Sequence, residues 1–227
     1  MKKLLFFVFC ALCALSVMAE EKFDMVYEAS SMELPNASAG FSLGGYQTQN
    51  SNAGAFCGLM PTDDGETALY LGHNDPVRKW NSFYYRDVNA DWQCITIDFK
   101  IAIIGESEKP QFSIGVNFKD MNRKNKNSYA NVCLGKKVLQ MGGTKPFEFG
   151  EGFRSFRMIA DKVTNKYQLY DMDNGGKFIN EFSVMHGTPQ HKPCNISFGD
   201  GSSAVEGEVM LMYAKFAFDK KYIPNQK

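Results

Sequence analysis

Residues 153–182 read FRSFRMIADKVTNKYQLYDMDNGGKFINEF, and this stretch decides the fold class. It contains three segments in which apolar and polar residues alternate, separated by polar turns at Lys162–Asn165 and Asp171–Gly176. Alternation with a period of two places successive side chains on opposite faces of a β-strand. Asn and Gly tolerate the positive φ angles that tight turns require. We therefore expect three consecutive antiparallel strands joined by two hairpin turns.

The same period of two continues on both sides of this stretch. Residues 94–103 alternate Ile or Phe with Thr, Asp, Lys and Ala, and residues 112–118 repeat the pattern. The final segment, 209–218, is apolar at both parities, so we expect a strand covered on both sides. One of its faces would carry Met210, Met212, Ala214, Phe216 and Phe218. Turn residues recur every ~8–12 positions and no segment keeps a helical period, which predicts an all-β sandwich of two packed antiparallel sheets.

Residues 1–19, MKKLLFFVFCALCALSVMA, have the pattern of a secretory signal peptide that ends at Ala19. Their apolar run is shorter than the roughly 20 residues of a membrane span. Cys10 follows Phe9 and Cys13 follows Leu12, whereas a bacterial lipid anchor needs a small residue before its cysteine. We expect residues 20–227 to form a single domain that is secreted, periplasmic or held at the cell surface, with no membrane span.

Charge and cysteine content narrow the partners and the redox chemistry. The chain has 25 basic and 25 acidic residues, and removal of Lys2 and Lys3 leaves it slightly acidic. Nucleic-acid binding needs a basic surface, so we expect no nucleic-acid partner. The cysteines outside the signal peptide are Cys57, Cys94, Cys133 and Cys194. In an exported protein they can form two disulfides in three pairings, or they can remain buried thiols.

The order of the motifs resembles a known fold family. Residues 153–161, followed by the Tyr-Gln-Leu-Tyr of 167–170 and the Asp/Gly turn, are similar to a hairpin of concanavalin A-like, laminin G-like jelly rolls. Residues 196–203, Ile-Ser-Phe-Gly-Asp-Gly-Ser-Ser, look like the end of that domain in secreted bacterial proteins. The resemblance implies a two-sheet jelly roll that binds glycans or proteins, or that hydrolyses polysaccharides in some members. Fold alone does not choose among these uses.

The catalytic pattern of the hydrolases with this fold is incomplete. They carry two glutamates on one face of a strand, with an aspartate between them. Here Glu206 and Glu208 lack that aspartate, and Asp98 stands alone. No Gly-x-Ser-x-Gly motif is present, and the three histidines lie in polar segments. We expect a domain that is not an enzyme and has no catalytic residues, with a degenerate glycoside hydrolase as an alternative.

The turn after Tyr170 begins like a calcium loop, because Asp171 and Asp173 stand two residues apart before Gly175. A complete loop needs a glutamate where Phe182 stands, and Glu181 comes one residue too early. A hairpin turn accounts for all of these residues. We therefore expect no metal and no cofactor, with calcium at this turn as the weaker alternative.

The segment 73–92 is the best candidate for a ligand site, because it contains both tryptophans among Asp, Asn and Arg residues. Glycan sites combine apolar rings with a few polar groups. The candidate ligand-binding residues are Trp80, Asn81, Asp75 and Tyr84. A place in the core is the alternative for these aromatics, and Phe83 and Tyr85 should face opposite to Tyr84.

The predicted function is glycan recognition by an exported module. The alternative is a structural or protein–protein interaction module at the cell surface.

Overall fold

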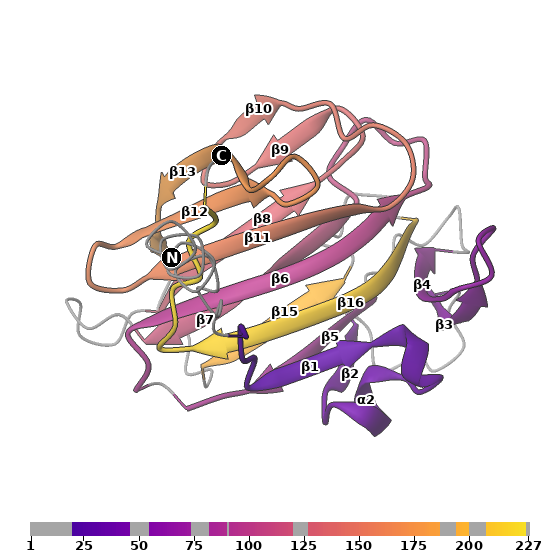
Figure 1. Ribbon diagram of the computed structural model, residues 1–227, viewed down its shortest axis with the longest axis horizontal. Helices are drawn as coiled ribbons and strands as arrows, with labels where there is room; N and C mark the ends of the chain where they lie inside the picture. The colour runs from indigo at the N-terminus through magenta and orange to yellow at the C-terminus, as the bar shows by residue number, and fades with distance from the viewer. Residues whose placement is uncertain are drawn as a thin grey trace, which may run out of the picture.

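The computed structural model describes residues 20–45, 55–73, 82–89, 91–119, 127–186, 194–199 and 208–225. Within these ranges two antiparallel β-sheets pack face to face (Figure 1). Sheet A comprises β1 (Met25–Glu28), β3 (Ala55–Pro61), β4 (Thr67–His73), β6 (Cys94–Ile103), β11 (Arg154–Asp161), β12 (Lys166–Asp171), β13 (Lys177–Ser183) and β16 (Val209–Phe218). Sheet B comprises β2 (Ser42–Gly45), β5 (Ser82–Asp87), β7 (Phe112–Lys119), β8 (Asn127–Leu134), β9 (Val138–Gln140), β10 (Thr144–Pro146), β14 (Met185–His186) and β15 (Asn195–Gly199).

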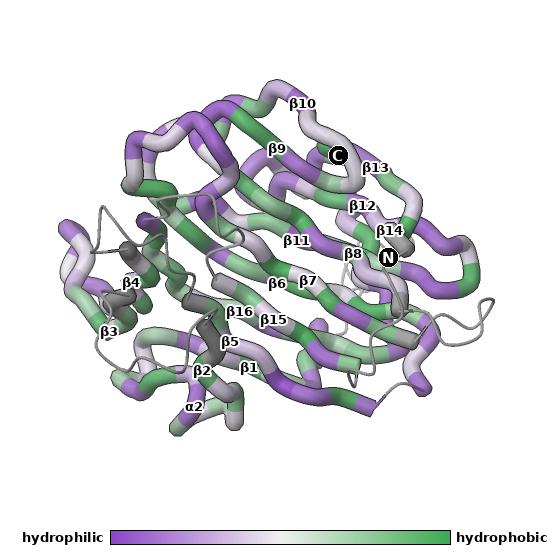
Figure 2. The backbone as a smooth tube through the Cα atoms, turned by 180° about the vertical axis from the view of Figure 1, so that it is seen from behind, coloured by the Kyte–Doolittle hydropathy of each residue, from purple (hydrophilic) through white to green (hydrophobic). Residues whose placement is uncertain are grey.

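The strand order confirms the predicted sandwich. Sheet A runs β13-β12-β11-β6-β16-β4-β3 with β1 beside β16, and sheet B runs β10-β9-β8-β7-β15-β5-β2 with β14 beside β8. The three strands predicted from residues 153–182 are β11, β12 and β13, which are neighbours in sheet A. Their turns use Asn165 at φ 60° and Gly175 and Gly176 at φ 66° and 75°. Polar and apolar residues alternate along the strands (Figure 2), and the apolar set fills the space between the sheets.

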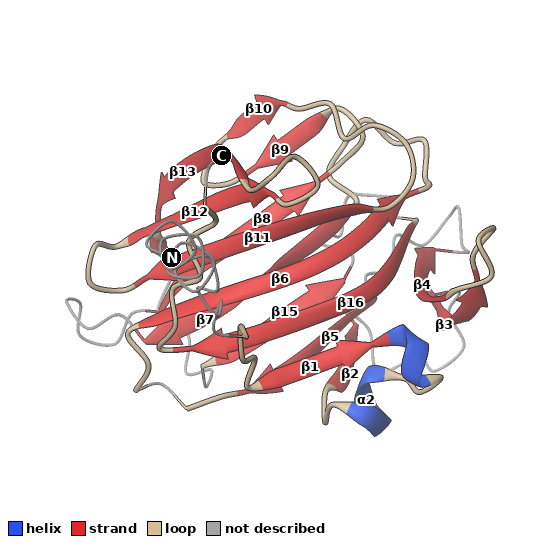
Figure 3. Cartoon of the chain, in the orientation of Figure 1, coloured by secondary structure: helices blue, strands red, loops and turns tan. Residues whose placement is uncertain are grey.

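Within the described ranges, helix is confined to two short segments, η1 (Ala29–Ser31) and α2 (Pro35–Ser38), which follow β1 (Figure 3). They were not expected from the sequence, because a single turn is too short to show a helical period. Pro35 begins α2 at a position where the missing N–H costs nothing. No helix in the described ranges is long and apolar enough to cross a membrane. Residues 1–19 lie outside the described ranges, so the signal peptide stays a prediction.

β16 does not keep the alternation that its sequence suggested. Its register with β6 shifts between Leu211 and Tyr213, which marks a β-bulge. A bulge adds one residue and reverses the parity of all that follow. Leu211 and Ala214 are therefore both fully buried on the core side, although the plain pattern placed them on opposite faces. The expectation that Met212 shares a face with Ala214 was wrong for this reason.

Both ends of the described chain cross the outer face of sheet A and meet at Arg157, whose exposure is 3%. The Nε of Arg157 donates to Oδ1 of Asp98 at 2.6 Å, and its Nη1 donates to Oε1 of Glu21 at 2.7 Å and to the Tyr222 carbonyl at 2.8 Å. The Tyr222 hydroxyl accepts from the backbone N–H of Lys22 and donates to its carbonyl, both at 2.9 Å. We call residues 20–24 and 218–224 together the terminal clasp.

The four cysteines outside residues 1–19 are thiols; two lie on the outer faces of the sheets and two pack against the core. Alternation with Ile95 places Cys94 on the outer side of sheet A, and pairing with Ser113 places Cys133 on the outer side of sheet B. Cys57 and Cys194 pack against the core. The sequence left open whether these cysteines form disulfides or remain thiols, and in the structure they are thiols.

Candidate functional site

Three of the four predicted site residues, Asp75, Trp80 and Asn81, lie outside the described ranges, and the structure gives no position for them. The fourth, Tyr84, is 1% exposed and stacks on Phe198 with ring centroids 5.7 Å apart. Its ring lies inside the sandwich and has no surface to offer a ligand. The choice of Tyr84 is therefore corrected, because its parity in β5 points inward.

Phe83 and Tyr85, which flank Tyr84 in β5, point to the outer face of sheet B. Buried residues on the inner face of β5, β7, β8 and β15 alternate with half-exposed residues on this outer side. We call this surface the polar face. It consists of Phe83, Tyr85, Ser113, Asn117, Tyr129, Asn131, Cys133, Asn195 and Ser197. The strand register brings together residues that are far apart in sequence: Asn117 stands opposite both Asn195 and Tyr129, and Ser197 stands opposite Tyr85.

Side-chain hydrogen bonds fix the orientation of the amides on the polar face. Nδ2 of Asn117 donates to Oδ1 of Asn195 at 3.0 Å. Each amide has two donor hydrogens and an acceptor oxygen, so this pair keeps capacity for further partners. Oγ of Ser113 donates to Oδ1 of Asn131 at 3.0 Å, and Nδ2 of Asn131 contacts Sγ of Cys133 at 3.4 Å. The face therefore presents donors and acceptors in set positions.

Gly115, in the middle of the polar face, has no side chain, and neighbouring groups occupy the space where one would lie. A Cβ at this position would lie 2.3 Å from the Ala130 carbonyl oxygen and 2.6 Å from Oδ1 of Asn131. A glycine inside a strand commonly marks a close approach of another group. Here the Asn131 amide lies across the glycine, so a larger residue would displace it from its hydrogen bonds.

The polar face is nearly free of charge. Of the outward side chains described in the strands of sheet B, only that of Asp87, at the end of β5, is ionic. Burial raises the pKa of the Cys133 thiol, against a hydrogen bond with Ser113 that lowers it, so this thiol stays neutral. The outer face of sheet A is different, because Asp98, Lys100 and Arg157 all point outward there.

Two aromatic rings stand at one side of the polar face. Phe83 and Tyr85 are half-exposed, with ring centroids 5.9 Å apart and planes 46° apart. Tyr85 is paired in register with Ser42 on one side and Ser197 on the other. Rings beside hydroxyl and amide groups form the kind of surface that can hold the apolar face of a sugar.

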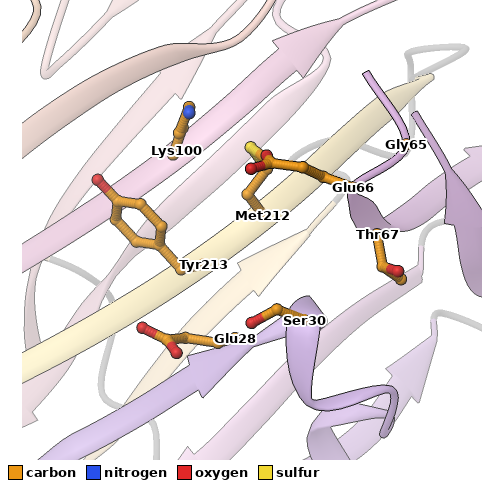
Figure 4. Close-up of a pocket in the computed structure, with 8 residues that line it drawn as sticks. All are labelled: Glu28, Ser30, Gly65, Glu66, Thr67, Lys100, Met212 and Tyr213. Atoms are coloured by element: carbon orange, nitrogen blue, oxygen red, sulfur yellow. The ribbon is translucent and has the colours of Figure 1, made fainter. Parts of the chain in front are cut away.

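A depression of about 470 Å³ lies over the outer face of sheet A (Figure 4). The bulge in β16 contributes Met212 and Tyr213 to it, and Glu28, Glu66 and Lys100 lie around them. Burial raises the pKa of Tyr213, although a hydrogen bond with Ser155 acts to lower it. Nζ of Lys215 binds Glu28 at 2.5 Å and lies 4.8 Å from the Tyr213 ring centroid. An ammonium therefore already lies over one face of the Tyr213 ring.

The carboxylates considered for catalysis or metal binding have structural partners. Asp98 binds Arg157. Glu208 hydrogen-bonds Tyr70, and burial together with this carboxylate raises the pKa of Tyr70. Asp171 binds Arg154 of β11 and accepts a hydrogen bond from the side-chain amide of Asn174 within the turn. In the ranges that the structure describes, no three His, Cys, Asp or Glu side chains are grouped to hold a metal. Glu206 lies outside those ranges.

No protein-family model matches the chain, and no curated protein matches its sequence. Solved structures do match in three dimensions. A carbohydrate esterase of the Shiga toxin-encoding bacteriophage phi24B has a TM-score of 0.60 at 9% identity, over 88% of this chain and 99% of that one. The fold is a jelly roll of two antiparallel sheets.

Two further solved structures also match the chain in three dimensions. The cellulose-induced protein Cip1 has a TM-score of 0.55 at 11% identity, over 87% of this chain and 98% of that one. Lectin I-B4 from Griffonia simplicifolia has a TM-score of 0.46 at 9% identity, over 79% of this chain and 100% of the lectin. The two structures with TM-scores above 0.5 confirm the predicted concanavalin A-like, two-sheet architecture as a fold, and identities this low carry no activity with them.

Proposed function

We propose that this protein is a non-catalytic glycan-binding module, and that the polar face binds an uncharged glycan. The observation that carries the proposal is the composition of the polar face, where amides, hydroxyls and two half-exposed rings stand together almost without charge. An ordinary solvated sheet face carries charged side chains, as sheet A does with Lys166 and Glu181. A sheet face of Asn, Ser, Tyr and Gly needs another explanation, and a neutral polyhydroxyl ligand supplies one.

The chemistry of such a complex follows from the groups present. Sugar hydroxyls both donate and accept hydrogen bonds, and the Asn117–Asn195 pair keeps groups of both kinds for them. The apolar face of a pyranose ring can lie on Tyr85 or Phe83. An anionic sugar finds no cation among the described side chains of this face, and Asp87 at its end would repel it. These features favour neutral hexose chains over sialylated or uronic ones.

Other observations support parts of the proposal. The fold-level neighbour from phage phi24B is named a carbohydrate esterase, so one protein of this fold is associated with carbohydrate. The structural partners of Asp98 and Glu208 favour a binding role over hydrolysis. Export, as residues 1–19 predict, would bring the domain to glycans in the periplasm, at the cell surface or outside the cell.

A glycan array on residues 20–227, with and without calcium, tests the proposal. We expect binding to neutral glycans in both conditions. For a glycan that binds, Tyr85→Ala should weaken the affinity about tenfold, which corresponds to 1.4 kcal/mol of lost stacking and contact. Tyr213→Ala, on the outer face of sheet A, is the matched control and should leave the affinity unchanged. An empty array, or equal affinity for wild type and Tyr85→Ala, would contradict the proposal.

A further inference from the structure

The depression over the outer face of sheet A lies where β16 changes its neighbour (Figure 4). β4 pairs with β16 as far as Leu211, and β1 pairs with β16 from Tyr213 onward. Neither ladder includes Met212, and the depression lies at this gap. Its volume, about 470 Å³, is within the roughly 300–1,000 Å³ of small-ligand sites. We call it the outer depression, and its lining includes Glu28, Glu66, Thr67, Lys100, Met212 and Tyr213.

The bulge in β16 forms the floor of the outer depression. Met212 has no register partner in β6, so one extra residue lies between Leu211 and Tyr213. Leu211 and Ala214 both face the core, which leaves the side chains of Met212 and Tyr213 together on the outer face. Bulges interrupt the ladder, and they are over-represented next to sites where they redirect a side chain. Here the bulge gives the depression a floor of one thioether and one aromatic ring.

Two of the charges around this floor lack an ionic partner. Glu28 binds Lys215, whose ammonium lies 4.8 Å from the Tyr213 ring centroid, so the charge of this carboxylate is matched. The half-buried Lys100 stands opposite Tyr213 in the next strand and forms no ion pair with any residue that the structure describes. Glu66, exposed at the end of the β3–β4 turn, likewise has no ion pair in the described ranges, and its side chain extends toward β16 (Figure 4). One unmatched cation and one unmatched anion therefore border the same depression.

The strand order sets the distance between these two charged residues. Lys100 belongs to β6 and Glu66 adjoins β4, the strands on either side of β16. Two strand spacings, or about 10 Å, therefore separate their backbones. A ligand that contacts both must carry opposite charges at its two ends and must be several ångströms long. Two extended residues of a peptide measure about 7 Å, and hydrogen bonds at each end cover the remaining distance.

Thr67 adds a hydroxyl whose present partner is weak. Its Oγ1 donates to Sδ of Met32 at 3.2 Å, and a thioether is a weak acceptor. Ser30 brings a second, exposed hydroxyl to the lining. A carbonyl oxygen accepts more strongly than sulfur, so a ligand with an amide group can replace the contact with Met32. This hydroxyl favours a peptide over a charged ligand that has no amide.

We propose that the outer depression binds a short peptide with free termini and apolar side chains, of the size of a dipeptide. The α-carboxylate pairs with Lys100, and the α-ammonium group pairs with Glu66. An apolar side chain of the peptide lies on Met212 and Tyr213, and the peptide carbonyl accepts from Thr67. Removal of either terminal charge leaves Lys100 or Glu66 unmatched and weakens binding. The site works independently of the polar face, which lies on the other sheet.

Titration with the dipeptide L-leucyl-L-leucine, followed by NMR of isotope-labelled methionine methyl groups, tests this inference. The chain has 12 methionines, and Met212→Leu, which nearly conserves volume, identifies the Met212 signal. If that variant does not fold, resonance assignment of the wild type replaces it. We expect a saturable shift of the Met212 signal with the dipeptide, and weaker binding of its C-terminal amide and its N-acetyl derivative. An unmoved Met212 signal, or equal affinity for either derivative, overturns the proposal.

Charge variants connect each end of the peptide with its residue. Lys100→Gln and Glu66→Gln should each weaken dipeptide binding about fivefold. Lys100→Gln should no longer distinguish the dipeptide from its amide, because the partner of the carboxylate is gone. Glu66→Gln should no longer distinguish the dipeptide from its N-acetyl derivative. If either variant keeps the selectivity of the wild type, the residue does not bind that terminus and the proposed site is refuted.

Matched controls separate this site from general effects of charge and from the polar face. Asp64→Asn, in the same turn as Glu66, and Lys177→Gln, in β13, change exposed residues that do not line the depression and should leave the affinity unchanged. Tyr85→Ala should weaken glycan binding at the polar face and leave dipeptide binding intact. Loss of dipeptide binding in Tyr85→Ala would place the peptide on the polar face and refute a site in the outer depression.

Discussion

At the scale of single residues, Gly176 shows how closely the C-terminal segment packs. Its φ is +75°, and a Cβ added to it would lie 2.1 Å from Cβ of Pro224. Gly175, one residue earlier, has φ +66° and nothing within 4 Å of the same position. Both positions disfavour a side chain for backbone reasons, but only Gly176→Ala also forces Pro224 away. We expect Gly176→Ala to cost about 1–3 kcal/mol more than Gly175→Ala, the usual range for overpacking.

Urea unfolding of the two alanine variants measures this difference directly. Because the turn strain is nearly the same in both, subtracting the two changes in unfolding free energy isolates the contact with Pro224. Equal losses would mean that residues 219–225 yield to the added methyl group and are not fixed against the β12–β13 turn.

Tyr84 and Tyr85 show what one sequence can and cannot say about a residue. The period of two in β5 correctly predicted that Phe83 and Tyr85 face away from Tyr84. It could not say which parity faces the core, because aromatics occupy both. Neighbouring strands decide this: Phe198 of β15 stands opposite Tyr84 and closes the core around it. The same alternation therefore supports Tyr85 and excludes Tyr84 as a surface ring.

At the scale of secondary-structure elements, the β11–β12 hairpin depends on Asp161. Its Oδ1 accepts the N–H groups of Val163 at 2.8 Å and Thr164 at 3.2 Å, and its Oδ2 binds Lys221. Burial alone would raise the pKa of Asp161, but hydrogen bonds from Lys221 and from the turn amides lower it below the ordinary value of 3.8. The ionised carboxylate therefore stabilises the folded state.

The sign of the pH dependence follows from that lowered pKa. The contribution of Asp161 is fully present above pH 3.8, the unfolded value, and is lost as the pH falls through the lower folded value. Asp161→Asn should cost about 1 kcal/mol at pH 6, since it keeps the turn acceptors and loses the ionic partner of Lys221. Urea unfolding at pH 3 should show a smaller cost. A cost that stays constant between pH 6 and pH 3 would refute this account.

The elements themselves were largely predictable, and their pairing was not. Residues 153–182 gave three strands and two turns, because local alternation and turn chemistry suffice for a hairpin. The polar face depends on long-range register, such as Asn117 of β7 beside Asn195 of β15, and no local pattern in one sequence encodes that pairing. The bulge at Met212 likewise depends on how β16 meets β6.

At the scale of the whole molecule, the terminal clasp ties both ends of the described chain to the middle of sheet A through Arg157. Burial alone would lower the pKa of Arg157, but hydrogen bonds to Asp98 and Glu21 raise it, so the guanidinium remains charged. Burial also raises the pKa of Asp98, although the hydrogen bonds and the charge of Arg157 act to lower it. The ionised form of this carboxyl therefore depends on Arg157. The two sheets give the fold its core, and this buried ionic group fixes the chain ends over one of them.

Arg157→Met therefore tests the clasp as a unit. It leaves Asp98 in a buried site without its cation, so the free energy of unfolding should fall by about 3–5 kcal/mol. Hydrogen exchange of residues 20–24 and 218–224 should become faster together, because both segments lose the same anchor, while β9 and β10 at the edge of sheet B keep their protection. Adding Asp98→Leu to Arg157→Met removes the unpaired carboxylate and should restore most of the lost stability. If the double variant is no more stable than Arg157→Met, packing around the long side chain of Arg157 stabilises the clasp, and its charge does not.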